Sequence, residues 1–230
     1  MANTYVFTPN PYHSNYYILV EGNIAVGKST FIHRLKNQLG VNASIHCEPV
    51  DKWTNLRGTN LLNEMYLDPI HRSFHIQSYI QLTMAMTQQL FSNKPIKVME
   101  RSLDSGRHVF TEAMKVSRHI DSTEYNILDE WYQWLEQRNV PTNEIIYLRS
   151  TPELALNRLR RRNRPEEEKV NLDYLTLIHD LHERWLMTPN KVNGPKVTVI
   201  DQNQSLEDTL CAADSLALEL KEKIYPHLLR

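Results

Sequence analysis

The stretch YYILVEGNIAVGKST, residues 16–30, decides the fold. An apolar run, YYILVE, precedes GNIAVGKST (22–30), where two glycines, a lysine and a hydroxyl have the spacing of a phosphate-binding loop. Glycine accepts dihedrals that other residues resist, so successive N–H groups can point at an anion. The helix expected at Lys28–Leu39 adds the positive end of its dipole. In this pattern Lys28 reaches the β/γ-phosphates and Ser29 ligates Mg²⁺, whereas a glycine turn beside a surface lysine is the structural alternative.

The composition suits one compact domain over residues 1–230 and excludes several classes of protein. The chain has 230 residues, 41% of them hydrophobic, and a net charge of −1, so no overall field attracts nucleic acid or an anionic membrane. Its two cysteines, Cys47 and Cys211, indicate a reducing compartment. No apolar run is long enough for a membrane span. We expect no nucleic-acid partner and no membrane.

The N-terminal segment MANTYVFTPNPYHSN, residues 1–15, has neither an arginine nor an apolar core. It is therefore expected to be neither a transit peptide nor a signal peptide, and to be flexible. A cytoplasmic or nuclear location follows, or a mitochondrial one if a targeting segment has been removed.

Five short stretches read as buried strands between long helical segments. They are Tyr16–Glu21, Ile96–Met99, Glu144–Leu148, Lys196–Ile200 and the weaker Ala43–Cys47. Strands that alternate with helices predict an α/β fold: a five-stranded parallel sheet with helices on both faces. Ligands of such sheets bind beyond the carboxyl ends of the strands, where the polar motifs of this sequence fall.

Two helical segments have unusual surfaces. From Ile70 to Ser92 the chain carries almost no charge, and Gln77, Ile80 and Met84 share one helical face. A helix buried in the core is the simplest interpretation, with a ligand or a second subunit as the other partners. The segment Tyr125–Leu135 is a second helix of this kind, and a last helix is expected over Ser205–Ile224.

Acidic and basic side chains follow two of the predicted strands. Glu48, held by Pro49 in an extended backbone, could accept a proton from an attacking hydroxyl, although a lone loop glutamate is more often solvated. Glu100, at the end of the next strand, could hold Mg²⁺, and the planar fork of Arg101 could meet phosphate or carboxylate oxygens. A structural ion pair is the alternative for these two residues.

The run RLRRRNR, residues 158–164, has five arginines in seven positions. A basic patch for nuclear import or RNA is one interpretation, and a solvated helix end balanced by Glu166–Glu168 is another. Its position after the fourth strand and its helix favours a mobile lid over phosphates, at about residues 158–170, in which arginines neutralise the transferred group. With the phosphate loop, these elements predict a phosphotransferase. The DxxG and NKxD motifs of a GTPase do not appear.

The sequence resembles the deoxyribonucleoside kinase family, closest to its mitochondrial thymidine kinase and insect multisubstrate branch. The similar segments run in family order from residue 16 to residue 186: GNIAVGKST, EPVDKW (48–53), NLLNEMYLDP (60–69), QSYIQLTM (77–84), MERSLDSGRHVF (99–110), IIYLRSTPE (145–153), RLRRRNRPEEEKV (158–170) and LHERWL (181–186).

The resemblance implies a role for each matching residue. Glu48 is the base that removes the proton of the nucleoside 5′-OH, Arg101 steadies that oxygen, and Lys28 completes the catalytic set. Ser29 and Glu100 hold Mg²⁺. ATP is bound by the loop and the lid, at Gly22, Asn23, Ile24, Ala25, Val26, Gly27, Lys28, Ser29, Thr30, Arg162, Arg164 and the weaker candidate Arg160. The nucleoside is bound by Glu48, Arg101, Trp53, Met65, Tyr66, Gln77, Ile80, Met84, Gly106, Phe110 and Glu167, with Tyr66 and Glu167 on the 3′-OH, Gln77 on the base edge and Phe110 stacked on the base.

The substrate follows from two of these positions. Where the family's deoxycytidine and purine kinases carry an arginine and an aspartate, this chain has Met84 and Gly106. An uncharged pocket with room for a 5-methyl group predicts thymidine and deoxycytidine as substrates, with extra space at Gly106 that could admit purines more weakly. The Gln77 amide carries a donor and an acceptor, and by flipping it could read either pyrimidine.

The resemblance also implies a homodimer, joined through the two unusual helices, and feedback inhibition by a triphosphate. Two other functions stay open. A nucleoside monophosphate kinase shares the loop and lid but needs a cationic site for the acceptor phosphate and no base such as Glu48. A catalytically idle fold that binds nucleotide or RNA would not need Lys28, Glu48 and Arg101 together.

Overall fold

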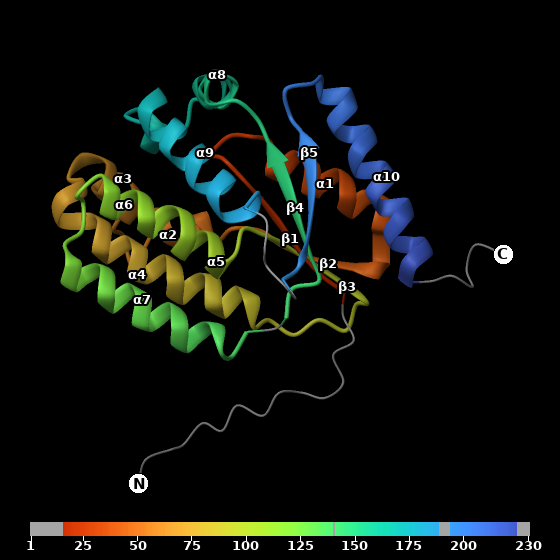
Figure 1. The fold of residues 1–230 in the computed structure, drawn as a ribbon, viewed down its shortest axis with the longest axis horizontal. Helices are drawn as coiled ribbons and strands as arrows, with labels where there is room; N and C mark the ends of the chain where they lie inside the picture. The colour runs from red at the N-terminus through yellow and green to blue at the C-terminus, as the bar shows by residue number, and fades with distance from the viewer. Residues whose placement is uncertain (1–15, 140, 189–193, 225–230) are drawn as a thin grey trace, which may run out of the picture.

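The computed structural model describes residues 16–139, 141–188 and 194–224. The expectation for residues 1–15 lies outside these ranges. Five parallel strands form one sheet in the order β2-β3-β1-β4-β5 (Figure 1). They are β1 (Tyr16–Gly22), β2 (Ala43–His46), β3 (Ile96–Glu100), β4 (Glu144–Arg149) and β5 (Lys196–Asp201). The predicted α/β fold with a five-stranded parallel sheet is therefore confirmed, and each strand begins where it was expected and ends within one residue of its predicted end.

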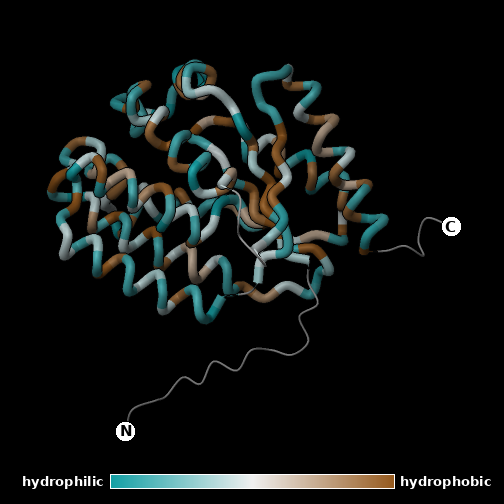
Figure 2. The backbone as a smooth tube through the Cα atoms, viewed as in Figure 1, coloured by the Kyte–Doolittle hydropathy of each residue, from teal (hydrophilic) through white to brown (hydrophobic). Residues whose placement is uncertain are grey.

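Alternate residues of β1 belong to two separate hydrophobic cores, one on each face of the sheet. Tyr17 and Leu19 face one side of the sheet, and Ile18 and Val20 face the other. All four are fully buried, because successive side chains of a strand point to opposite faces and both faces are covered. In Figure 2 the strands in the middle of the molecule are largely brown, the colour of hydrophobic residues.

The helices lie on both sides of the sheet (Figure 1). The second face is covered by α1 (Lys28–Leu39) and α10 (Leu206–Ile224), which also pack against each other. The first face is covered by α4 (Pro69–Gln88), α7 (Ser122–Glu136), α9 (Leu172–Leu186) and the consecutive turns α5 (Leu103–Ser105), η2 (Gly106–Thr111) and α6 (Glu112–Val116). Shorter elements complete the edges: η1 (Gly40–Asn42), α2 (Val50–Thr54), α3 (Leu61–Leu67), α8 (Pro152–Arg162) and η3 (Pro165–Glu167). Among the described residues, none of the helices has the length and apolar character that a membrane crossing requires.

Helix α4 ends at Gln88, four residues before the predicted end at Ser92. Lys97, from the neighbouring strand β3, donates to the carbonyl oxygens of Gln88 and Leu90 at 2.6 and 2.9 Å. These bonds satisfy carbonyls that a helix leaves open at its end. The helix therefore stops where a lysine of the next strand can cap it, and the uncharged residues just after Gln88 give no sign of this end.

Gly22 ends β1 in a conformation that only glycine adopts comfortably. Its φ is +143°, and a Cβ added there would lie 2.5 Å from the carbonyl oxygen of Leu148 on β4. We expect Gly22→Ala to lower the free energy of unfolding by at least about 3 kcal/mol, because backbone strain and steric overlap add. Gly58→Ala is the matched control: Gly58 has a φ of +93° but open space around it, so the loss should be about 1–2 kcal/mol. Urea unfolding of both variants measures the difference, and equal losses would contradict this explanation.

Candidate functional site

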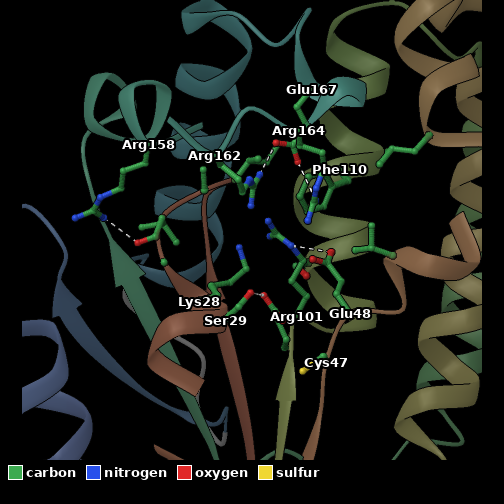
Figure 3. Close-up of a pocket in the computed structure, with 18 of the residues that line it drawn as sticks. Lys28, Ser29, Cys47, Glu48, Arg101, Phe110, Arg158, Arg162, Arg164 and Glu167 are labelled. Carbon is green, nitrogen blue, oxygen red and sulfur yellow. Dashed lines mark hydrogen bonds and ion pairs between the residues drawn. The ribbon is translucent and has the colours of Figure 1, made fainter. Parts of the chain in front are cut away.

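One cavity of about 910 Å³ opens beyond the carboxyl ends of three adjacent strands. In the order β2-β3-β1, each strand delivers a motif to it: Glu48 two residues after β2, Glu100 and Arg101 at the end of β3, and the loop 22–27 after β1. Because parallel strands end at the same edge, residues far apart in sequence meet here, as the sequence predicts. Figure 3 shows Lys28 beside Ser29, and Glu48 beside Arg101.

The loop between β1 and α1 is closed around its own lysine. Gly27 has a φ of +106°, and Ala25 has a φ of +59°. The Lys28 ammonium donates to the carbonyl oxygens of Asn23 and Gly22, at 2.9 and 3.3 Å. Burial, with the nearby Arg101 charge as the second cause, lowers the pKa of Lys28 to about 7. A buried cation without an anionic partner of its own is suited to receive the charge of phosphate oxygens.

Glu48 and Arg101 form an ion pair in the middle of the cavity. The Arg101 Nε atom lies 3.0 Å from Glu48 Oε1, and Arg101 also donates to the Gly22 carbonyl oxygen at 2.9 Å. The guanidinium carbon lies 4.7 Å from the centre of the Phe110 ring. Arg101 has a φ of +61°, a strained value for a non-glycine residue, and such outliers gather at functional sites. Three fixed contacts thus hold one cation between the loop, the carboxylate and the aromatic ring.

A fully buried acid, Glu21, lies close to this ion pair. The Glu21 side chain is fully buried on β1 and accepts a hydrogen bond of 2.5 Å from the Ser102 hydroxyl. Burial raises the pKa of Glu21 to about 7, although Arg101 opposes the shift. Sequence reasoning placed Glu21 in a strand and gave it no role. Its hydrogen bond fixes Ser102, the residue that follows Arg101.

Ser29 and Glu100 present two oxygen ligands at the loop. The Ser29 hydroxyl donates to Glu100 Oε1 at 2.9 Å (Figure 3). Mg²⁺ prefers oxygen ligands and usually takes one or two from the protein, the others being waters and phosphates. The pair fits such an ion bound together with a nucleotide. Within the described ranges, no group of three or more His, Cys, Asp or Glu side chains forms a metal cage.

The other end of the cavity is mainly apolar. Nine of the predicted nucleoside-binding residues line it in addition to Glu48 and Arg101: Trp53, Met65, Tyr66, Gln77, Ile80, Met84, Gly106, Phe110 and Glu167. The Trp53 indole is fixed by a 2.9 Å hydrogen bond to Thr83 on α4. Burial raises the pKa of Tyr66 well above its usual range, so its hydroxyl stays neutral. Tyr174 and Met114 also line the cavity and were missed by the sequence analysis.

The arginine-rich segment closes the cavity from above. Arg162 and Arg164 both pair with Glu167, which is buried on η3, and the Arg164 contact measures 3.1 Å (Figure 3). Asn60, the N-cap of α3, donates to Glu166 at 3.0 Å and ties this segment to the nucleoside side. The predicted phosphate-binding arginines and the predicted sugar-binding glutamate are therefore partners of one another in the structure.

Three predicted ATP-binding residues do not line the cavity: Gly22, Asn23 and Arg160. The Asn23 amide donates instead to the Leu175 carbonyl oxygen on α9 at 2.8 Å. Arg160 is exposed. Two arginines of the run that were not predicted as ATP-binding residues, Arg158 and Arg161, do line the cavity. Arg158 donates to the carbonyl oxygens of Val26 and Gln202, which fixes it to the loop between β1 and α1 (Figure 3).

Comparison with known proteins agrees with this geometry. The profile of the Deoxynucleoside kinase family matches residues 18–225. Mitochondrial thymidine kinase 2 of Macaca fascicularis is 39% identical over 196 residues, which cover 84% of this chain and 73% of the relative. A probable deoxycytidine kinase of Fowlpox virus is 38% identical over 189 residues, covering 81% and 77%. Deoxycytidine kinase of Mus musculus is 33% identical over 236 residues, covering 89% of each chain.

Proposed function

This chain belongs to the deoxynucleoside kinase family, and we propose that it transfers the γ-phosphoryl group of ATP to the 5′-OH of thymidine and deoxycytidine, for nucleotide salvage. The observation that carries the proposal is one continuous cavity with Lys28 at its phosphate end, Glu48 and Arg101 in the middle and the uncharged Gln77 pocket at the far end. We propose a single kinase domain with a lid over about residues 158–170. A cytoplasmic, nuclear or mitochondrial location is compatible with it, the macaque relative being named as mitochondrial.

The phosphate end would bind ATP through the N–H groups of residues 24–30 and the Lys28 ammonium. Mg²⁺ held by Ser29 and Glu100 would offset the charge of the β- and γ-phosphates. Arg158, Arg161, Arg162 and Arg164 surround the same space and would stabilise charge on the transferred group. Phosphoryl transfer needs little covalent help, so positioning these charges is most of the catalytic task.

Glu48 would take the proton of the acceptor hydroxyl. The ion pair with the Arg101 guanidinium would hold the carboxylate in position between the phosphate end and the apolar pocket. Arg101, held over Phe110, would steady the oxygen as it attacks. Tyr66 and Glu167 would bind the 3′-OH, and binding there would exchange a lid ion pair for a contact with substrate.

The pocket beyond Glu48 would seat the base. Phe110 offers a stacking surface, worth on the order of 1–3 kcal/mol by analogy with nucleic-acid sites. Met84 and Gly106 leave the base without a charged neighbour at the positions where the resemblance places one in other kinases. Purine deoxynucleosides would be weaker substrates.

The acceptor class separates this proposal from a monophosphate kinase. We expect phosphorylation of thymidine in the presence of ATP and Mg²⁺, and no phosphorylation of thymidine monophosphate under the same conditions. Ion-exchange separation of the products from both acceptors provides the test. Turnover of the monophosphate alone would replace the proposal with the monophosphate kinase, and turnover of neither would favour an idle nucleotide-binding fold.

We also propose a homodimer through α4 and α7, which pack against each other. Their outer surface exposes large apolar side chains: Leu82, Met86 and Leu90 from α4 and its end, and Ile127, Trp131 and Trp134 from α7. Apolar patches rimmed by polar residues mark interaction surfaces. Solution scattering at micromolar concentrations should give the mass of two chains, and a single monomeric mass throughout would refute the dimer.

A further inference from the structure

The amide of Gln77 is held by a triangle of polar atoms at the base end of the cavity. Its Nε2 atom donates to the Gly106 carbonyl oxygen at 2.9 Å and to the Thr111 hydroxyl at 3.1 Å. The Thr111 hydroxyl donates in turn to the same Gly106 oxygen at 2.9 Å. Gln77 and Thr111 are both fully buried. Neither the sequence analysis nor the proposed function gives Thr111 a role.

This triangle fixes which end of the amide is nitrogen. The Gly106 carbonyl can only accept a hydrogen bond, and the Thr111 hydroxyl proton is already donated to that carbonyl. Both partners therefore present acceptor lone pairs to Gln77, and an N–H group must face them. A flipped amide would place its oxygen against two acceptors. It would replace the three hydrogen bonds by at most one, from the Thr111 hydroxyl turned toward the amide oxygen.

The triangle leaves one donor and one acceptor of Gln77 for a ligand. Seen from Nε2, the nearly equal distances place the Gly106 and Thr111 oxygens about 60° apart, whereas the two N–H bonds of an amide diverge by about 120°. One N–H that lies between the two oxygens can therefore serve both, which leaves the second N–H for a ligand. The Gln77 Oε1 atom is buried and has no hydrogen-bond partner. A buried acceptor without a partner costs free energy that a ligand N–H can recover.

We propose that Thr111 and the Gly106 carbonyl lock Gln77 in this orientation, and that the enzyme therefore selects 4-keto pyrimidines, thymine and uracil, over the 4-amino pyrimidine cytosine. The inference rests on the proposed function and on the room for a 5-methyl group beside Met84 and Gly106, which seats the 5-position of the base toward Gly106. Nε2 of Gln77 is the amide atom that is hydrogen-bonded to Gly106. It therefore lies opposite position 4 of the base, which is next to position 5, and Oε1 lies opposite N3 of the base. Thymine offers an oxygen at position 4 and an N–H at position 3, which match. Cytosine offers an amino group and a bare nitrogen, which place donor against donor and acceptor against acceptor.

Two pairs of nucleosides that differ only at positions 3 and 4 test the lock in the wild-type enzyme. Thymidine is compared with 5-methyldeoxycytidine, and deoxyuridine with deoxycytidine, so the methyl group is constant within each pair. We expect kcat/KM to favour the keto nucleoside by at least about tenfold in both pairs, since two mismatched hydrogen bonds cost that or more. A preference for the amino nucleoside in both pairs would show that the base is seated the other way and would overturn the inference.

The variant Thr111→Val tests whether the Thr111 hydroxyl positions the Gln77 amide. It removes two of the three hydrogen bonds of the triangle, one of them to the amide, and reduces the advantage of the observed orientation over the flipped one from two hydrogen bonds to one. The keto preference should therefore fall about fivefold, the effect of one neutral hydrogen bond, while the KM for ATP stays unchanged. Thr111→Ser, which keeps the hydroxyl, should restore the ratio. Thr87→Val is the matched control, because Thr87 is a buried threonine on α4 whose hydroxyl donates to a helix carbonyl away from the cavity.

An unchanged keto preference in Thr111→Val would overturn the role of Thr111. If that variant does not fold, the wild-type ratios still decide whether the enzyme selects the keto nucleosides. Wild-type turnover of none of the four nucleosides would overturn the proposed function, and the inference with it. Turnover of all four at equal kcat/KM would overturn the inference alone.

Discussion

Replacing Glu48 with glutamine is expected to lower kcat/KM for thymidine by roughly 1,000-fold, within the range that a positioned general base contributes. The amide has nearly the same shape but cannot take up the proton of the 5′-OH. Its neighbour Arg101, 3.0 Å away in the ion pair, would also lose its charge partner. Steady-state kinetics with thymidine and saturating ATP measures the loss.

Two controls separate lost chemistry from lost structure. Calorimetric titration should show that Glu48→Gln still binds ATP, because the phosphate-binding loop is unaltered. Glu153→Gln, which neutralises an exposed glutamate at the start of α8, should leave kcat/KM unchanged. A loss in Glu48→Gln of less than tenfold would mean that another group takes the proton.

Replacing Lys28 with methionine should reduce kcat/KM for ATP by roughly 100- to 1,000-fold, as removal of one charge-stabilising donor does in other active sites. Burial already lowers the pKa of Lys28 to about 7, so the folded protein gains little from this charge without a ligand. The thermal unfolding midpoint of the ligand-free variant should therefore equal or exceed that of the wild type. A variant that loses activity and stability together would point to a structural lysine.

The same pKa makes ATP binding dependent on pH. Phosphate oxygens favour the charged ammonium, so binding raises the pKa of Lys28 above its ligand-free value of about 7. Above pH 7 the free enzyme must take up a proton to bind ATP, and the affinity falls as the pH rises. Calorimetry at pH 8 in buffers of different ionisation enthalpy should show uptake of about one proton. Lys28→Arg keeps its charge and should show none.

The sheet and the meeting of its motifs could be predicted because both depend on local sequence. Continuous apolar runs mark the strands, and the carboxyl-end rule brings Glu48, Glu100 and the phosphate-binding loop together. The end of α4 could not be predicted in the same way, because Lys97 of β3 caps its carbonyls. The hydrogen bond that fixes the Asn23 side chain could not be predicted either, because its acceptor, the Leu175 carbonyl oxygen, lies 152 positions away in the sequence.

The positions of the arginines in the run 158–164 follow a pattern that the sequence contains. Leu154, Asn157, Arg158 and Arg161 all line the cavity, and they recur at the spacing of one helical face on α8. Arg160 falls outside that spacing and points to solvent. The density of positive charge indicated a lid, but only the helical periodicity tells which arginines face the cavity.

The measurement that tests the function most directly is ATP- and Mg²⁺-dependent phosphorylation of thymidine, deoxycytidine, deoxyadenosine and deoxyguanosine, compared side by side as kcat/KM. The uncharged pocket of Met84, Gly106 and Gln77 predicts turnover of the pyrimidines with thymidine highest, and weaker turnover of the purines. Purine values equal to those of the pyrimidines would contradict the pocket argument, and no turnover of any of the four would contradict the proposed kinase activity itself.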